Sequence, residues 1–492
     1  MTLAQSLLQR LNGSKSFLFF FCICFSLASC SLFQPASKVD NGKKKKKEEL
    51  DPIQGRKVFD PETGTYVIVE ETPTEKMDTI IWKDLPSDSY PPITSASDGF
   101  VDNNNTNEVI RIDNYGSEIL TSYNLSIVLP FLSHRFDDTS VDIYPDSRYA
   151  LNFYAGARMA LDELGDEGVR LNVNVYDSKA SENTVRDLLR TDPDLPNSHL
   201  IVGPYRRQNV QKVADYAKKE NITFISPYSA SANLSSANPF YLQLSPTLES
   251  HCEAITKHAL EKYRSDQIVL VCREKPEELA RLKYFQDALK LKEGIDVEPF
   301  EEFRISTQSV DLAEMDLLPF LELRDTSVFI LPSWSNETFI YSFLRKLDVS
   351  RDASSYIVVY GMPQWMQYEK IDYDYFEKLN VHVSSDSHID NYANDIQFFK
   401  RRFYDRYGAI PTIDAYLGYD VMLFGGRMLQ KYGTKFQYSL DMEDKRYLHT
   451  KFNFEKVVQP GTTGQENRPV DRFENKYINI LKFSDYQFKL QN

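Results

Sequence analysis

Two polar segments in the middle of the chain, Gly203–Gln208 and Ser226–Ser231, each follow an apolar run and carry side chains suited to binding a charged group. The first segment holds Arg206 and Arg207, and arginine binds a carboxylate or a phosphate through two parallel hydrogen bonds. The alternative is that both arginines only begin an exposed helix, because arginine usually lies at the surface. The residue types therefore point to binding of an anion, and the helix interpretation stays open beside it.

A strand, helix, strand unit is predicted to position the two segments. Apolar residues recur between them with helical spacing, at Val210, Val213, Ala214 and Ala217. Apolar runs at 201–202 and 222–225 predict the flanking strands, and such a unit implies a parallel sheet with a right-handed crossover. Ligands of open parallel sheets collect beyond the carboxyl ends of the strands. Both segments are therefore expected at the same edge of one sheet.

The chain after Asn124 alternates between strand and helix patterns. Further strands are predicted at 125–129, 171–176, 268–271, 328–331 and 357–360. This alternation predicts an α/β fold, and the sequence lacks the period of about 20 to 50 residues that indicates a solenoid or a propeller. A length of 492 residues is enough for two or three domains, and the net charge of −14 disfavours nucleic acid as a partner.

The first 30 residues have the pattern of a bacterial lipoprotein signal peptide. A basic start precedes an apolar run from Phe17 to Ala28, which is short for a membrane span, and the run ends in Leu27-Ala28-Ser29-Cys30. This tetrad resembles the lipobox, which implies cleavage before Cys30 and acylation of its sulfur and its new amino group. We therefore expect attachment to a membrane of the cell envelope through this lipid anchor only, facing the periplasm. An ordinary secretory signal is the alternative.

Residues 31–122 are predicted to be a mostly disordered tether. The segment contains the Lys43–Lys47 run and a middle rich in Asp, Glu, Pro and Ser, with strand-like patterns only at 65–71 and 79–82. Ser31, directly after the anchor, is compatible with an outer-membrane location. A long tether would let the folded part act at a distance from the membrane.

Few side chains combine into a catalytic or metal-binding pattern. His251 and His258 share one face of a predicted helix, but two helical turns, roughly 10 Å, separate them, which is too far for one zinc ion. The motifs of zinc proteases, serine hydrolases and nucleotide-binding loops are absent from the sequence. We expect no catalytic residue, no metal, no cofactor and no enzyme activity. Cys252 and Cys272 either pair or lie buried as thiols, with burial favoured.

The order of motifs resembles the type I periplasmic binding proteins, in particular the leucine/isoleucine/valine-binding branch of ABC-transporter receptors. The stretches that resemble the first lobe are NLSIVLPF, YALNFYAGARMALDEL, VNVYDSKASENTV, LIVGPYRRQNV and ITFISPYSAS. The stretches FILPSWSNE and IVVYGMPQW resemble strands of the second lobe. The stretch FYDRYGAIPTIDAYLGYDVMLFGGRML resembles a late helix pair of the family and contains its RYG-x-x-P and GYD signature.

The resemblance implies two Rossmann-like lobes with parallel sheets, joined by three chain crossings and closing around a ligand by hinge motion. Carried onto this sequence, lobe 1 holds residues 123–246 and 386–436, and lobe 2 holds residues 247–385 and 437–492.

The resemblance also implies where a ligand binds. In the family, hydroxyl residues and backbone amides at the strand ends of lobe 1 hold the charged groups of the ligand, and lobe 2 adds an aromatic lid. The implied ligand-binding residues are Tyr205, Arg206, Arg207, Gln208, Tyr228, Ser229, Ala230 and Ser231 in lobe 1 and Ser333, Trp334, Met362 and Trp365 in lobe 2. The sequence departs from the family at Tyr205-Arg206-Arg207, because small residues are usual there. These three side chains would crowd a small pocket and add positive charge.

These observations predict a lipid-anchored solute-binding protein that captures a small amino-acid-like or anionic ligand between two lobes for an ABC transporter. The alternative is an envelope lipoprotein that uses the same fold to bind and regulate a protein partner, such as a peptidoglycan synthase. The long tether and the bulky Tyr-Arg-Arg segment favour the alternative. A hydrolase in the interlobe cleft would need a nucleophile with a base in reach, which the sequence does not offer.

Overall fold

The structure is a computed structural model that divides the chain into two units, Met1–Val101 and Asp102–Asn492. The described residues are 116–136, 143–306, 315–321, 325–352, 355–442, 446–458 and 469–491, with the backbone of three short strands at 56–60, 65–69 and 110–111. The predicted signal peptide, its Cys30, the Lys43–Lys47 run and the strand pattern at 79–82 lie outside the described residues.

The described part of the first unit is one hairpin. Strand β1 (Arg56–Asp60) pairs antiparallel with β2 (Thr65–Val69), which falls within the strand pattern of residues 65–71. The neighbouring strand β1 was not predicted, because its sequence RKVFD has only two apolar residues to signal it.

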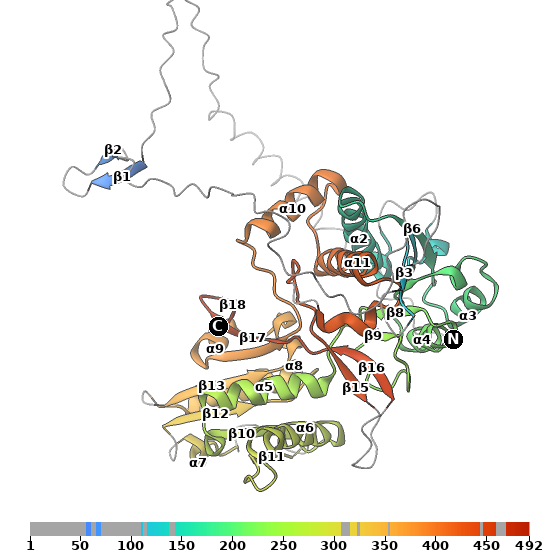
Figure 1. Ribbon diagram of the computed structural model, residues 1–492. Helices are drawn as coiled ribbons and strands as arrows, with labels where there is room; N and C mark the ends of the chain where they lie inside the picture. The colour runs from blue at the N-terminus through green and yellow to red at the C-terminus, as the bar shows by residue number, and fades with distance from the viewer. Residues whose placement is uncertain are drawn as a thin grey trace, which may run out of the picture. The chain divides into compact units, whose positions relative to one another are not determined.

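The second unit contains two seven-stranded α/β sheets, one in each lobe (Figure 1). The first sheet has the order β15 (Phe454–Val458), β16 (Val470–Asn475), β9 (Tyr241–Gln243), β8 (Thr223–Ser226), β7 (Leu200–Val202), β5 (Tyr123–Leu129) and β6 (Leu171–Asp177). The second has the order β11 (Glu301–Ile305), β10 (Ile268–Arg273), β12 (Thr326–Ile330), β13 (Tyr356–Gly361), β14 (Val381–Ser385), β17 (Asn479–Ser484) and β18 (Gln487–Leu490). The predicted two-lobe fold is confirmed, with the addition that antiparallel strands extend both parallel sheets.

Helices cover both sheets. The first lobe has α2 (Arg148–Asp166), α3 (Glu182–Thr191), α4 (Arg207–Glu220), α10 (Asn394–Tyr407) and α11 (Ile413–Tyr432). The second lobe has α5 (Leu248–Lys262), α6 (Pro276–Glu293), α7 (Leu318–Leu321), α8 (Glu337–Ser350) and α9 (Tyr373–Lys378). None of the helices in the described part of the chain combines the length and the apolar character that crossing a bilayer requires.

The first lobe buries both faces of its sheet, which explains its unbroken apolar strands. Leu125 and Ile127 of β5 belong to the core under α2 and α11, whereas Val128 belongs to the core under α3 and α4. The helical stripe predicted from Val210 to Ala217 lies in the latter core. Successive side chains of a strand point to opposite faces, so a strand covered on both sides must be apolar throughout.

The C-terminal region differs from the prediction that residues 437–492 return to lobe 2. Strands β17 and β18 do join the second sheet, but β15 and β16 extend the first sheet. The reason is apolar packing, because Phe454 and Phe473 enter the first-lobe core and the ring of Phe454 stacks 5.7 Å from that of Phe424 on α11. The third crossing therefore lies between β16 and β17.

The predicted end of the tether at residue 122 is also wrong. The two-residue strand β4 (Glu118–Ile119) pairs with β3 (Ile110–Arg111), and its neighbour Ser117 donates a hydrogen bond of 2.6 Å to the carbonyl of Tyr432. The amide of Thr434 donates to the carbonyl of Glu118 at 3.0 Å. These bonds satisfy backbone groups at the end of α11, so the folded part begins before residue 122.

The two cysteines of the folded part are free and buried. Cys252 on α5 and Cys272 on β10 both have no exposed surface and lie in the core of the second lobe. The favoured prediction of buried thiols is confirmed.

The closest helix contact of the first lobe is the crossing of α2 and α11, which lie side by side in Figure 1. A Cβ at Gly156 would stand 1.8 Å from the carbonyl oxygen of Ala415, and a Cβ at Gly418 would stand 1.9 Å from the carbonyl oxygen of Phe153. Each glycine thus admits the backbone of the other helix. Gly156 of the YALNFYAGARMALDEL stretch and Gly418 of the GYD signature are the two halves of one contact.

We expect Gly156→Ala to lower the free energy of unfolding by about 1 to 3 kcal/mol, because the added methyl group must push the two helices apart. Urea unfolding followed by circular dichroism measures this change. The control is Gly165→Ala in the same helix, where nothing lies within 4 Å of the added Cβ. The control should be neutral or slightly stabilising, since alanine favours helix over glycine. Equal destabilisation by both variants would contradict the close contact.

Candidate ligand-binding site

The end of β7 brings the first predicted segment to the carboxyl edge of the first-lobe sheet. Gly203 has φ of +95°, and a Cβ there would stand 2.2 Å from the carbonyl oxygen of Val128, so only glycine fits. A cis peptide bond joins it to Pro204. Helix α4 then begins at Arg207 with Arg206 as the capping residue, and both arginines are exposed. Arg206 and Arg207 therefore do begin an exposed helix, and the side chain of Arg206 remains available at this edge.

Three tyrosines stand together at the strand ends. The ring of Tyr205 lies 4.7 Å from that of Tyr149 on α2 and 5.4 Å from that of Tyr228, which follows β8. The rings of Tyr149 and Tyr228 are 5.6 Å apart, and the hydroxyl of Tyr228 donates a 3.1 Å hydrogen bond to Asp414 on α11. Burial raises the pKa of Tyr228, and burial also raises the pKa of Asp414. We call Tyr149, Tyr205 and Tyr228 the tyrosine wall.

The cavity beside the tyrosine wall measures about 530 Å³. Tyr149 and Tyr205 line it together with three cationic side chains and one carboxylate, namely Arg135, Lys179, Arg206 and Asp146. Within the described residues, neither Lys179 nor Arg206 forms an ion pair. We call this space the basic cavity, since its charged lining favours an anion.

Asp177, at the end of β6, fixes the loops around the basic cavity. Its carboxylate accepts hydrogen bonds from the amides of Leu132, Ser133 and Lys179 at 2.8 to 3.1 Å and from the hydroxyl of Ser133 at 2.7 Å. Burial opposes the charge of Asp177, but these hydrogen bonds outweigh it and lower its pKa. Asp177 therefore supports the cavity without lining it, whereas Lys179 and Ala180 of the same turn do line it.

A second, smaller cavity of about 200 Å³ lies on the other side of Tyr228, beside the chain crossings. Its lining includes Asp386, Asp414 and His449, and we call it the acidic cavity. Asp420, the aspartate of the GYD signature, accepts hydrogen bonds from the amide of His449 at 2.9 Å and from its ring. The signature thus positions the loop that carries His449. In the described part of the chain, no cluster of three or more His, Cys, Asp or Glu is placed to hold a metal ion.

Two predicted residues of lobe 2 need correction. Met362 and Trp365 have no exposed surface and lie in the second-lobe core. The indole of Trp365 donates a 3.1 Å hydrogen bond to the carbonyl of Ser333 and covers Gly361, where a Cβ would stand 2.3 Å from the ring. These contacts give both residues a packing role, because an enclosed side chain cannot touch a ligand.

The remaining predicted residues differ in their exposure and in whether they line a cavity. Ser333 is 1% exposed, whereas Trp334 is partly exposed and has its carbonyl held by the hydroxyl of Tyr368 at 2.9 Å. The other predicted residues line neither cavity and are Arg207, Gln208, Ser229, Ala230 and Ser231. Lining residues that the sequence did not reveal are Arg135, Tyr149, Lys179, Asp386 and Asp414. Tyr149, Lys179 and Asp414 fall within stretches that resemble the family but were not marked as binding residues, and Arg135 and Asp386 fall outside those stretches.

The lobes are joined at the crossings by a buried carboxylate. Glu474, fully buried at the end of β16, accepts hydrogen bonds from the amide and hydroxyl of Thr247 at 3.0 and 2.8 Å and from Ser250 at 2.7 Å. Arg472 and Lys476 lie 2.7 and 3.1 Å from its oxygens. Burial alone would raise the pKa of Glu474, but the Lys476 charge and these hydrogen bonds lower it to about 2. The first and third crossings are therefore tied together.

The depressed pKa of Glu474 predicts acid sensitivity. The unfolded chain takes up this proton near pH 4.5 and the folded chain only near pH 2, so the stability contributed by the carboxylate is lost as the pH falls through this window. In Glu474→Gln the melting temperature should decrease less between pH 4.5 and pH 2 than it does in the unmodified protein. The variant should also be less stable at pH 7, by about 3 to 5 kcal/mol. Glu293→Gln, on the exposed end of α6, is the control. An unchanged acid profile in Glu474→Gln would contradict this role.

The comparisons with known proteins agree with this geometry. The family described as "Receptor family ligand binding region" matches residues 154–452. The chain belongs to this family. The match begins within α2 and ends before β15, so it covers Tyr205 and Tyr228 of the tyrosine wall but not Tyr149, and only part of the basic cavity. A search of curated proteins gave no match.

Solved structures share the fold of this receptor-family chain at low sequence identity. A putative branched-chain amino acid ABC transporter protein from Rhodospirillum rubrum is 17% identical, with a TM-score of 0.54, and the match covers 75% of this chain and 100% of the other. An ABC transporter substrate-binding protein from Desulfitobacterium hafniense is 14% identical, with a TM-score of 0.51 and the same coverage of both chains. The fold is that of the type I periplasmic binding proteins.

Proposed function

We propose that the protein is a lipid-anchored, extracytoplasmic solute-binding protein that captures a small anionic ligand between its lobes for an ABC transporter. The observation that carries the proposal is the basic cavity at the carboxyl edge of the first-lobe sheet. Its three cations face one carboxylate, and Tyr149 and Tyr205 supply flat apolar surfaces beside them. Sheet edges of this kind are where α/β folds bind ligands.

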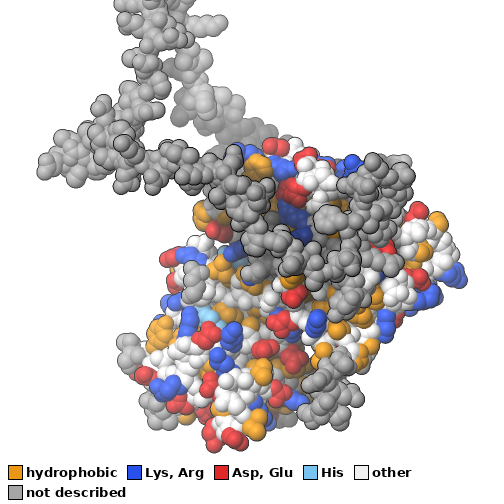
Figure 2. Space-filling model, in the orientation of Figure 1, with side chains coloured by type: hydrophobic (Ala, Val, Ile, Leu, Met, Phe, Trp, Pro, Cys, Tyr) orange, Lys and Arg blue, Asp and Glu red, His pale blue; other side chains and the backbone are white. Residues whose placement is uncertain are grey.

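Several observations support the transporter role. The two neighbours with the same fold are described as ABC transporter proteins, one for branched-chain amino acids. Both lobes are joined by three crossings, as hinge closure requires. Anchoring rests on Leu27-Ala28-Ser29-Cys30, which lies outside the described residues. In Figure 2, acidic and basic side chains are interspersed over the visible face of the second lobe, which suits a partner other than nucleic acid. A binding role without catalysis is consistent with the family description.

The ligand class differs from that of amino-acid binders because of the tyrosine wall. Tyr205 and Tyr228 fill the strand ends where the resembling family keeps small residues, so a small zwitterion has little room there. The space that remains is the basic cavity, with a lining rich in arginine and lysine. We therefore favour a carboxylate or a phosphate that also carries a flat or apolar group to stack on Tyr205.

The test is ligand-dependent melting of the chain from Ser31 onward against amino acids, dicarboxylates, sugar phosphates and nucleotides. A ligand at 100 times its Kd should stabilise the protein by about 2.7 kcal/mol. Arg206→Ala should weaken binding at least about 10-fold, because a charged hydrogen bond contributes roughly 1.5 to 3 kcal/mol. The matched control is Arg207→Ala, since the adjacent Arg207 is exposed but does not line the basic cavity. Equal losses in both variants, or no stabilising ligand, would overturn the proposal.

A second candidate function is an envelope lipoprotein that binds and regulates a protein partner, such as a peptidoglycan synthase. The observation that favours it is again the tyrosine wall, because strand ends filled by aromatic side chains can contact a protein surface as well as a solute. Tyr205 is 48% exposed although it is large and aromatic. Crosslinking in the intact envelope distinguishes the two functions. Recovery of permease subunits supports the transporter role, and recovery of a synthase without permease supports the second candidate.

A further inference from the structure

A groove near the crossings runs along an open sheet edge. β18 is the last strand of the second sheet, and β17 is its only neighbour among the described strands. Its four residues, Gln487–Leu490, all line one cavity of about 640 Å³. Successive side chains of a strand point to opposite faces, so a cavity that touches all four must lie along the hydrogen-bonding edge.

The register of the hairpin shows which backbone groups point into this groove. The amide of Gln491 donates to the carbonyl of Ile480 at 3.1 Å, and Lys489 stands opposite Lys482. Hydrogen-bonded and non-bonded pairs alternate in an antiparallel ladder. Phe488 and Leu490 therefore turn their N–H and C=O groups toward the open edge, where an added strand would find them.

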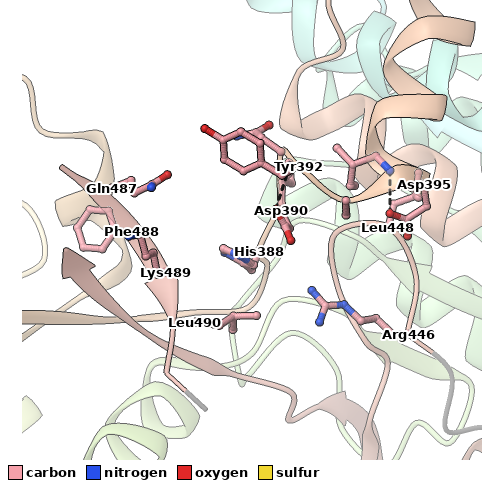
Figure 3. Close-up of a pocket in the computed structure, with 14 residues that line it drawn as sticks. His388, Asp390, Tyr392, Asp395, Arg446, Leu448, Gln487, Phe488, Lys489 and Leu490 are labelled. Atoms are coloured by element: carbon pink, nitrogen blue, oxygen red, sulfur yellow. Dashed lines mark hydrogen bonds between the residues drawn. The ribbon is translucent and has the colours of Figure 1, made fainter. Parts of the chain in front are cut away.

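The opposite wall of the groove is the segment His388–Ile396, which leads into helix α10 of the first lobe. Hydrogen bonds hold this wall in place, from the amide of His388 to the carbonyl of His449 at 2.7 Å and from the amide of Tyr392 to Asp390 at 2.9 Å. Figure 3 shows β18 on one side and His388, Asp390 and Tyr392 on the other. Tyr392 is 84% exposed at the rim. The groove is thus formed before any partner binds.

The size of the groove fits a short strand. An extended chain rises about 3.3 Å per residue, lies about 4.8 Å from its neighbouring strand and takes about 10 Å across the sheet. Four residues of such a chain therefore occupy roughly 630 Å³. The cavity of about 640 Å³ has room for a segment of this size. Its lining is partly apolar, through Ile389, Leu448 and Leu490, as the side chains of an added strand would require.

The charge of the groove selects the side chain that the added strand carries. Asp390 and Asp395 each accept a backbone hydrogen bond from their own segment, and Lys489 is paired with Asp485. Arg446 forms no ion pair within the part of the chain that the structure describes, and its guanidinium extends toward β18 in Figure 3. An acidic side chain on the added strand would pair with it.

We propose that this groove binds an extended segment of a partner protein, which adds to the edge of β18 as a further strand and places an acidic side chain against Arg446. The site is separate from the basic cavity and does not depend on the solute-binding role. Main-chain hydrogen bonds to Phe488 and Leu490 supply affinity, and Arg446 supplies selectivity. Because the groove lies between β18 of one lobe and the segment leading into α10 of the other, its occupant contacts both lobes.

The test uses the full chain and a fluorescent peptide, acetyl-Thr-Val-Glu-Val-Thr-amide, followed by fluorescence anisotropy and by hydrogen exchange of the β18 amides. The peptide should bind and slow the exchange of the Phe488 and Leu490 amides at least about 10-fold. A peptide N-methylated at alternate amides should bind at least about 10-fold more weakly, because it cannot join the ladder. Arg446→Glu should weaken the Glu peptide and strengthen its Lys counterpart, whereas the control Arg264→Glu, away from the groove, should change neither.

Three outcomes would overturn the proposal. The first is no binding at 1 mM peptide, roughly the weakest affinity that a specific contact gives. The second is equal binding of the N-methylated peptide, which would mean that the edge is not used. The third is self-association of the chain that Leu490→Pro abolishes, which would identify a second copy as the occupant. Proline is tolerated at a sheet edge, so Leu490→Pro removes the outward N–H and keeps the ladder to β17.

Discussion

The first lobe depends on one close contact, the crossing of α2 and α11 through Gly156 and Gly418. Gly156 and Gly418 are more than 250 residues apart in sequence, and most of the second lobe, from α5 to β14, is inserted between the two helices. Their backbones can approach only because neither glycine carries a Cβ. Once α11 lies against α2, its first turn brings Asp414 to Tyr228, and its middle brings Asp420 to the loop at His449. The positions of Asp414 and of the loop at His449 in the site therefore depend on the packing of these two helices.

Buried carboxylates hold the loops around the cleft. Asp177 organises the turn after β5, Asp420 organises the loop at 448–449, and Glu474 ties the first crossing to the third. In each case backbone amides donate to the carboxylate, which satisfies groups that a loop would otherwise leave unpaired, and for Asp177 and Glu474 hydrogen bonds of this kind also lower the pKa. Acidic side chains that look like candidates for chemistry thus serve mainly as structural acceptors.

The tyrosine wall separates two spaces of opposite charge. The basic cavity lies on one side of it and the acidic cavity on the other, and Tyr228 contacts Asp414 across the boundary. An aromatic wall is rigid, since tyrosine has few rotatable bonds, and its hydroxyl groups still offer hydrogen bonds. The shape of this edge explains why a fold shared with amino-acid receptors is expected to accept a different ligand.

The open edge of β18 adds a surface of a different kind. Natural sheets usually cover or shorten their edges, and here the strand is short but faces a preformed groove. Solute binding at the first lobe and strand addition at the second would use separate surfaces of one molecule. The groove at β18 contacts both lobes, whereas the basic cavity is lined by first-lobe residues.

The sequence by itself determined the α/β class and the strand ends at residues 203 and 226, because apolar runs and helical stripes are local patterns, and the two lobes followed from the resemblance of its motifs to a known family. It also indicated the glycines of α2 and α11 and the buried cysteines. Only the tertiary structure decided that β15 and β16 join the first sheet, that Met362 and Trp365 belong to the core, and that Arg135, Lys179 and Asp146 meet Arg206. Those outcomes depend on contacts between segments far apart in the chain, and no local period encodes which apolar face or which cation a distant segment will meet.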